Sequence, residues 1–154
     1  MEAYLKFEVI LQYVAIPCLT VSRSATQTIS NSNSNSNEIA KLSRKLPNCK
    51  GRLDYCLIFD WLRECGVKQI LRVIVQDDQA APHSDEIIEL ALEGFGIEDF
   101  DWQKVDLCTE TVLKAAPDVK IVHLYSTGNN AVLRGWSDTG GLQRLKNVSL
   151  LRCL

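Results

Sequence analysis

Short runs of β-branched, apolar residues alternate with helix-like segments through the second two-thirds of this chain. Residues 70–75 (ILRVIV) and 120–125 (KIVHLY) are nearly continuous apolar runs of strand length, which are typical of strands buried in a parallel sheet. A shorter strand is expected at residues 97–102, and a last one at residues 148–151. Alternation of strands and helices with short connections predicts an α/β fold, a parallel sheet built from successive βα units.

Periodicity and end signals mark the helices between these strands. Residues 53–65 carry apolar side chains at helical spacing, and Gly66 is suited to end that helix. Ser84 is a candidate N-cap for the next helix, whose first turn is acidic. Further short helices are expected at residues 109–115 and 129–136.

A four-residue pattern of apolar residue, Lys, any residue and Ile or Val recurs at residues 67–70, 119–122 and 145–148. The intervals of 52 and 26 residues suggest a unit of about 26 residues, in the range of leucine-rich repeats. The copy expected near residue 93 is missing. A doubly wound sheet shows the same alternation of strands and helices, so the leucine-rich-repeat-like and doubly wound architectures both stay open.

The first third of the chain differs in composition from the rest. Residues 1–50 hold six Lys or Arg and three acidic residues, whereas the whole chain has a net charge of −2. Residues 30–37 (SNSNSNSN) are a low-complexity run without apolar side chains that could offset the cost of ordering the backbone. We therefore expect an apolar and basic leader at 1–29, a Ser/Asn-rich linker at 30–49 and the α/β domain at 50–154.

Within the leader, residues 9–21 (VILQYVAIPCLTV) are apolar but too short to span a bilayer. Glu2 and Glu8 outnumber Lys6, so the positive start of a secretory signal is missing, although a small-residue cleavage site can be drawn at residues 22–25. The alternative is a short helix or strand that lies on the body. We expect a cytoplasmic protein with reduced cysteines and no membrane association.

The net charge and the absence of known motifs exclude several classes of function. A net charge of −2 does not supply the concentrated basic face that a phosphate backbone needs, so no nucleic acid is expected as a partner. The chain has two His and lacks C-x-x-C and H-E-x-x-H motifs, so no metal or cofactor is expected. It also lacks a glycine-rich phosphate loop and a G-x-S-x-G elbow, and we assign no catalytic residue.

Asp77 and Asp78 close the strongest predicted strand. Ligands bind at the carboxyl ends of strands in open α/β sheets, so the two carboxylates could hold a divalent cation. His83 follows in a stretch (PHSDE) that contains a hydroxyl and two acids. We favour the simpler interpretation, in which polar residues end a buried strand and begin a loop. The alternative is a small metal-dependent α/β enzyme.

Residues 125–136 (YSTGNNAVLRGW) form the most distinctive stretch. Asn129 and Asn130 can bond backbone groups just after a strand, in the way that Asn connects the turns of repeat solenoids. Arg134 and Trp136 could form a protein-binding hot spot. The structural alternative, which we favour, places Trp136 over an edge of the core.

Five blocks of the sequence carry a family resemblance. They are FDWLRECGVKQILRVIVQDD (59–78), PHSDE (82–86), DWQKVDLC (101–108), AAPDVKIVHLYS (115–126) and GNNAVLRGWS (128–137). Together they resemble a region of fungal intracellular subtilisin-like serine proteases that precedes the peptidase domain.

This resemblance implies a noncatalytic accessory or protein-interaction domain. The family's Asp, His and Ser triad belongs to the downstream peptidase domain and has no counterpart in this chain. The implied partner is another protein or an adjoining peptidase domain. The chain would then be a stand-alone relative, a truncated copy or an incomplete gene product, and its end at Leu154, just after a predicted strand, favours truncation.

Overall fold

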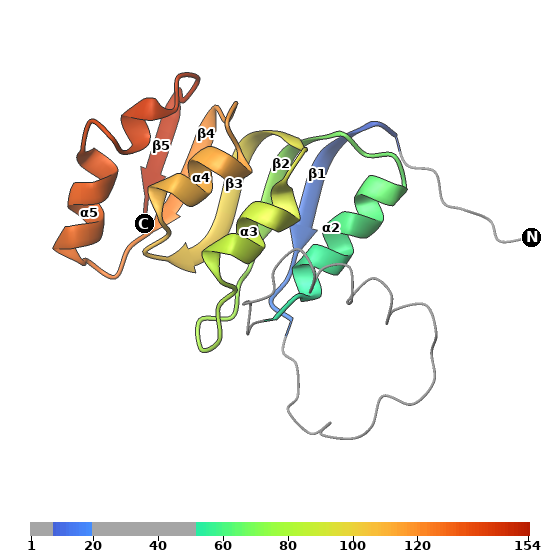
Figure 1. The fold of residues 1–154 in the computed structure, drawn as a ribbon, viewed down its shortest axis with the longest axis horizontal. Helices are drawn as coiled ribbons and strands as arrows, with labels where there is room; N and C mark the ends of the chain where they lie inside the picture. Colours follow the sequence, from blue (N-terminus) through green and yellow to red (C-terminus); the bar gives the residue numbers. More distant parts are fainter. Residues whose placement is uncertain (1–7, 20–51) are drawn as a thin grey trace, which may run out of the picture.

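Five parallel strands and the helices that connect them form one α/β sheet structure (Figure 1). A computed structural model describes residues 8–19 and 52–154. In chain order the elements are β1 (Ile10–Ile16), α2 (Asp54–Glu64), β2 (Gln69–Val75), α3 (Asp85–Leu92), β3 (Gly96–Val105), α4 (Thr109–Ala115), β4 (Ile121–Tyr125), α5 (Asn130–Ser137), the 3-10 turn η1 (Leu142–Arg144) and β5 (Leu150–Cys153). The strands lie in the order β1-β2-β3-β4-β5, and every neighbouring pair is parallel. The predicted α/β fold of successive βα units is confirmed.

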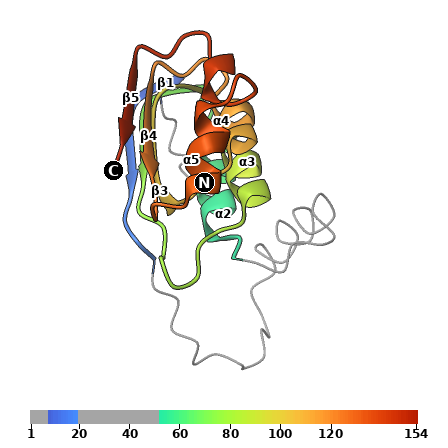
Figure 2. The same cartoon turned by 90° about the vertical axis from the view of Figure 1, so that its left-hand side faces the viewer.

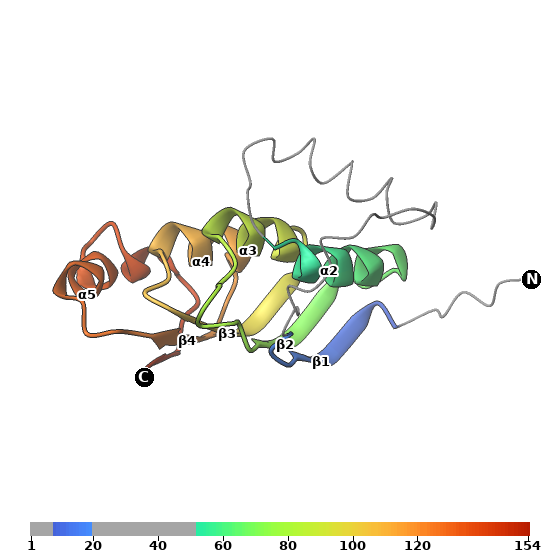
Figure 3. The same cartoon turned by 90° about the horizontal axis from the view of Figure 1, so that it is seen from below.

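The helices lie on one face of this sheet, as Figures 2 and 3 show. A doubly wound sheet needs a reversal of strand order and helices on both faces. The observed order follows the sequence without a reversal. The described part of the chain is therefore singly wound rather than doubly wound, and no described helix covers the other face of the sheet.

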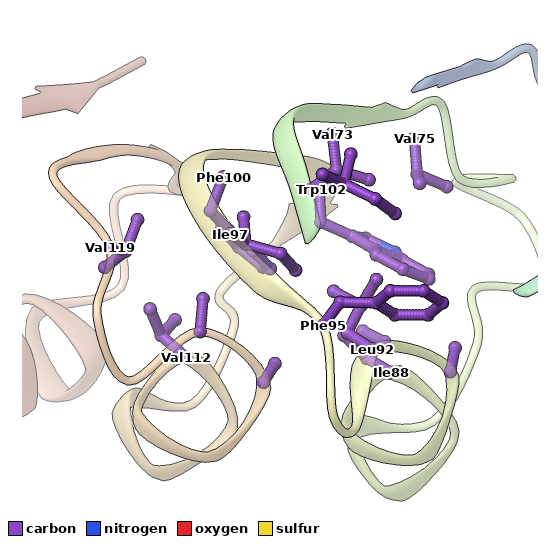
Figure 4. Close-up of a cluster of buried hydrophobic side chains, with 14 of the residues drawn as sticks. Val73, Val75, Ile88, Leu92, Phe95, Ile97, Phe100, Trp102, Val112 and Val119 are labelled. Carbon is purple, nitrogen blue, oxygen red and sulfur yellow. The ribbon is translucent and has the colours of Figure 1, made fainter. Parts of the chain in front are cut away.

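Apolar residues recur at positions i, i+3 and i+5 of each strand unit and face the helices. The central triplets are fully or almost fully buried, namely Ile70/Val73/Val75, Ile97/Phe100/Trp102 and Val119/Val122/Leu124. The strand register aligns them, with Val73 opposite Phe100 and Phe100 opposite Val122. Figure 4 shows residues of this core, with Ile88 and Leu92 contributed by α3.

The spacing between equivalent strand positions is not constant. Val73, Phe100, Val122 and Leu151 lie in one row of the sheet, and their intervals are 27, 22 and 29 residues. The three intervals average 26 residues, the unit expected from the sequence, and they vary around that length because the connecting loops and helices differ.

The first strand comes from the segment that the sequence places in the leader. Ile10 pairs with Gln69 and Ile16 with Val75, so residues 10–16 form an edge strand of the sheet rather than a separate region. The expected linker at 30–49 lies outside the described residues. In the part of the chain that is described, every helix is too short and too polar to cross a membrane.

Local signals explain where the helices end. Gly66 adopts φ of 92° after α2, a left-handed conformation that glycine tolerates well, and Val67 N–H donates to Leu62 O over 3.1 Å. Ser84 precedes α3 as expected, but its hydroxyl makes no capping hydrogen bond. The helix predicted at residues 109–115 coincides with α4.

Candidate functional site

The Asp77 carboxylate, directly after β2, is buried and surrounded by donors. Its Oδ1 accepts the Asp78 N–H over 2.9 Å and the His83 Nδ1–H over 2.8 Å. Its Oδ2 accepts the His83 backbone N–H over 3.1 Å and the Trp102 indole N–H over 3.0 Å. A carboxylate offers about four lone-pair positions, so these four protein donors occupy them.

This arrangement keeps the Asp77 carboxylate charged. Burial raises the pKa of Asp77, but the hydrogen bonds from His83 and Trp102 outweigh it and hold that pKa below its ordinary value. Nδ1 of His83 faces the carboxylate, and its Nε2 is buried without a hydrogen-bond partner among the described residues. The ring of Tyr55 stacks on His83 with centroids 4.2 Å apart, and its hydroxyl donates to Gln76 O. These contacts hold the loop after β2 in place.

Asp78 points to different partners from Asp77. Its Oδ1 accepts the Ala80 N–H over 2.9 Å, and its Oδ2 lies 3.4 Å from Arg52 Nη1. Within the described part of the chain, no group of three or more His, Cys, Asp or Glu is arranged to hold a metal ion. Both carboxylates are engaged by protein groups, which favours the loop-forming interpretation of this pair.

The four residues singled out around α5 do not form one surface. Asn129 is the N-cap of the helix, because its Oδ1 accepts the Ala131 N–H over 3.0 Å. Asn130 begins the helix and is exposed, as is Arg134. Trp136 is 7% exposed, and its indole N–H donates to Leu107 O over 2.9 Å. Trp136 is therefore buried, as the structural alternative expects, whereas Asn129, Asn130 and Arg134 are exposed.

Carboxylates, rather than Asn129, connect the turns of neighbouring units. Asp77 joins the loop after β2 to Trp102 of β3. Asp106, which follows β3 with a positive φ of 55°, accepts the Thr127 N–H over 3.0 Å and the Thr127 hydroxyl in the loop after β4. Hydrogen bonds from Thr127 lower the pKa of Asp106. Asn129 does bond a backbone group just after a strand, and among the described residues that bond lies within the start of its own helix.

A network of polar side chains lies on the sheet face opposite the helices, and the sequence analysis missed it. Arg72 Nε of β2 lies 3.2 Å from Asp99 Oδ2 of β3. His123 of β4 lies between two carboxylates, with Nε2 3.3 Å from Asp99 Oδ1 and Nδ1 3.9 Å from Asp101 Oδ2. The Tyr125 hydroxyl donates to Asp101 Oδ1 over 2.8 Å. The network therefore spans three neighbouring strands.

The centre of this network is buried although none of the described helices covers it. The side chains of Asp99, Asp101 and His123 are 15%, 9% and 5% exposed. Burial, together with the hydrogen bond to Asp101 and its charge, raises the pKa of Tyr125 to about 12. The phenol therefore stays protonated and keeps donating across the neutral pH range, which fixes the arrangement.

Exposed side chains flank this buried centre. Arg72 is 43% exposed, and the strand register places the exposed Tyr13 of β1 beside it. On the other side, the exposed Arg152 of β5 is in register with His123. We call Tyr13, Arg72, Asp101, His123 and Arg152, with their neighbours on the same face, the open face. In the sequence, the open face corresponds to polar residues that stand between the apolar i, i+3 and i+5 positions of a strand. An example is Ile97-Glu-Asp-Phe-Asp-Trp102.

Comparison of the chain with protein-family models, with curated proteins and with solved structures gives no match. The resemblance to the region that precedes the peptidase domain of fungal subtilisin-like proteases stays a prediction. The geometry of the described residues therefore carries the functional proposal.

Proposed function

We propose that this chain is a noncatalytic protein-interaction domain whose binding surface is the open face of the sheet. The observation that carries the proposal is that the described helices pack on one face of the sheet only. The other face presents a polar network. In a sheet wound in one direction, each βα unit adds side chains to the same surface. Such a surface suits an extended protein partner.

The spacing of the apolar triplets supports this proposal. Positions i, i+3 and i+5 match the L-x-x-L-x-L segment of leucine-rich repeats, in which the strands line the inside of a horseshoe. By this comparison the open face carries two rows, Tyr13/Arg72/Asp99/Ile121/Leu150 and Ala15/Ile74/Asp101/His123/Arg152. The similarity to leucine-rich repeats lies in the spacing of apolar residues along each strand, whereas the length of the unit varies.

The surroundings of the two histidines support a noncatalytic role. A histidine that activates a serine or cysteine lies within hydrogen-bond reach of that nucleophile. His83 instead bonds Asp77 through Nδ1, and its buried Nε2 has no hydrogen-bond partner. Both ring nitrogens of His123 face carboxylates. We expect the partner to be another protein or the peptidase domain of a subtilisin-like protease, with this domain in an accessory role.

Binding to a separately purified peptidase domain of a fungal intracellular subtilisin-like protease tests the proposal. Arg152→Glu changes an exposed open-face arginine, and Arg134→Glu is the matched change on α5. Interface arginines at hot spots contribute about 2 kcal/mol, so Arg152→Glu should weaken binding roughly 30-fold in calorimetry, while Arg134→Glu leaves it unchanged.

The opposite pattern, with loss of binding only in Arg134→Glu, would place the interface on the helix side and contradict the open face. Absence of binding would remove the peptidase domain as the partner. Hydrolysis of casein by the purified chain, blocked by a serine-directed inhibitor, would contradict the noncatalytic role.

A further inference from the structure

We propose that Arg72 of β2 is a carboxylate-binding group of the open face, and that its ligand is an acidic segment of the partner protein in extended conformation. This inference rests on the proposed binding role of the open face and specifies the chemistry of the partner. It is carried by the arrangement of the Arg72 guanidinium, which Asp99 holds at one edge while the side chain stays partly exposed.

The guanidinium of Arg72 is fixed at its Nε edge. This Nε is buried, and Oδ2 of Asp99 on β3 lies 3.2 Å from it. The other oxygen of Asp99 lies 3.3 Å from Nε2 of His123 on β4, so groups from two strands flank this carboxylate. Because a guanidinium is planar, fixing its Nε edge also sets the direction in which its two Nη groups point.

The Nη groups of Arg72 are available to a ligand. The side chain is 43% exposed, and in the described part of the chain no second acid and no carbonyl group engages it. Arg63 shows the contrast, since its Nη1 pairs with Asp60 and its Nη2 donates to Leu90 O over 2.9 Å and to Ala91 O over 2.7 Å. The donors of Arg63 therefore hold the fold together, whereas Arg72 keeps donors for a partner.

The charged groups in this part of the open face are buried to different depths. The side chains of Asp99 and Asp101 are 15% and 9% exposed, whereas that of Arg72 is 43% exposed. A partner that approaches the face therefore meets the guanidinium before the carboxylates, and a negatively charged group is its complement. The net charge of the whole chain is −2, but charges more than about 8 Å away are largely screened at physiological ionic strength, so the local arrangement decides the contact.

The neighbours of Arg72 suit an acidic peptide segment. A carboxylate of Asp or Glu accepts two parallel N–H bonds from a guanidinium, which gives the contact a defined geometry as well as charge. The strand register places the exposed Tyr13 of β1 beside Arg72. The ring of Tyr13 offers an apolar surface on which the aliphatic part of an acidic side chain can pack.

Binding of two fluorescently labelled octapeptides to the full chain tests the proposal. One peptide alternates Glu and Thr, and its neutral counterpart alternates Gln and Thr. The Thr residues favour an extended conformation in both peptides, so the two differ mainly in charge. Fluorescence anisotropy should show that the unaltered chain binds the acidic peptide roughly tenfold more tightly than the neutral one.

Three variants separate a fixed guanidinium from simple attraction between charges. Arg72→Lys keeps the positive charge but removes the planar set of donors, so it should weaken binding of the acidic peptide roughly fivefold. Arg134→Lys is the matched change at an exposed arginine of α5 and should leave binding unchanged. Asp99→Ala removes a negative charge, which alone would strengthen binding of an acidic peptide. We expect weaker binding instead, because the guanidinium loses the group that orients it.

The proposal is overturned if the chain does not prefer the acidic peptide, if Arg72→Lys binds that peptide like the unaltered chain, or if Arg134→Lys weakens binding equally. Stronger binding by Asp99→Ala would overturn it as well. The open face itself is judged by the separate measurement on the peptidase domain. If Arg152→Glu weakens that complex while Arg72→Lys changes the binding of neither ligand, the open face remains the interface and the acidic segment is removed as its ligand.

Discussion

The indole N–H of Trp102, in β3, donates to Oδ2 of Asp77, the residue two positions beyond the end of β2, over 3.0 Å. The contact joins two neighbouring units through side chains that are both buried. A buried indole needs an acceptor and a buried carboxylate needs donors, so each group offsets the cost of burying the other. Asp77 therefore holds the sheet and its loop together.

Replacement of Asp77 by Asn tests this role. Asp77→Asn should lower the free energy of unfolding by about 2–4 kcal/mol, because an amide N–H₂ would face donors on His83 or Trp102. Urea denaturation followed by tryptophan fluorescence measures the change. The control is Asp78→Asn, at a partly exposed carboxylate, with an expected loss below about 1 kcal/mol. Equal losses in the two variants would contradict the assignment.

The main strands and helices could be predicted from local pattern. Residues 70–75 and 109–115 were recognisable because a β-branched run and a helical period bounded by Pro117 are short-range signals. A short strand that lies on the body is one of the alternatives for residues 9–21, but its place in the sheet depends on pairing with β2, more than fifty residues away in the sequence.

The polar network on the open face could not be predicted from the sequence either. Asp101 and His123 each look like an ordinary polar residue in a strand, and only the register between β3 and β4 brings them together. That register follows from non-local packing of the apolar rows. The sequence marks Asp77 and His83 as candidate residues, but their hydrogen bonds to each other and to Trp102 depend on how the strand and loop fold together.

The titration of Tyr125 tests the open-face network. Its pKa of about 12 in the folded protein lies above the ordinary value near 10, so the phenol contributes stability below about pH 10 that is lost as the pH rises toward 12. The absorbance difference between the unaltered chain and Tyr125→Phe should show no phenolate up to about pH 11.

Asp101→Asn removes the neighbouring charge and should shift this titration toward about pH 10. The measurement is the same difference titration made on the Asp101→Asn background, with and without Tyr125→Phe. A Tyr125 transition that does not move when the carboxylate is removed would show that Asp101 does not control the phenol.

Addition of divalent metal tests the alternative enzyme hypothesis at Asp77 and Asp78. Four protein donors surround the first carboxylate, and Arg52 and a backbone N–H engage the second. We therefore expect the melting temperature to stay constant in a titration with Mg²⁺ or Mn²⁺. A specific site would raise it, because a ligand that binds only the folded state stabilises that state. A rise that disappears in the Asp77→Ala/Asp78→Ala double variant would support the metal site instead.

Asn129 and Asn130 are adjacent in sequence, and the structure assigns them different roles. Asn129→Ala should lower the free energy of unfolding by about 1 kcal/mol, because its Oδ1 accepts the Ala131 N–H at the start of α5. Asn130→Ala should be neutral or slightly stabilising, since that residue is exposed within the helix, where Ala is preferred. Chemical denaturation of both variants measures the difference. If the two asparagines acted instead as a paired binding element, both substitutions would leave stability unchanged and weaken partner binding equally.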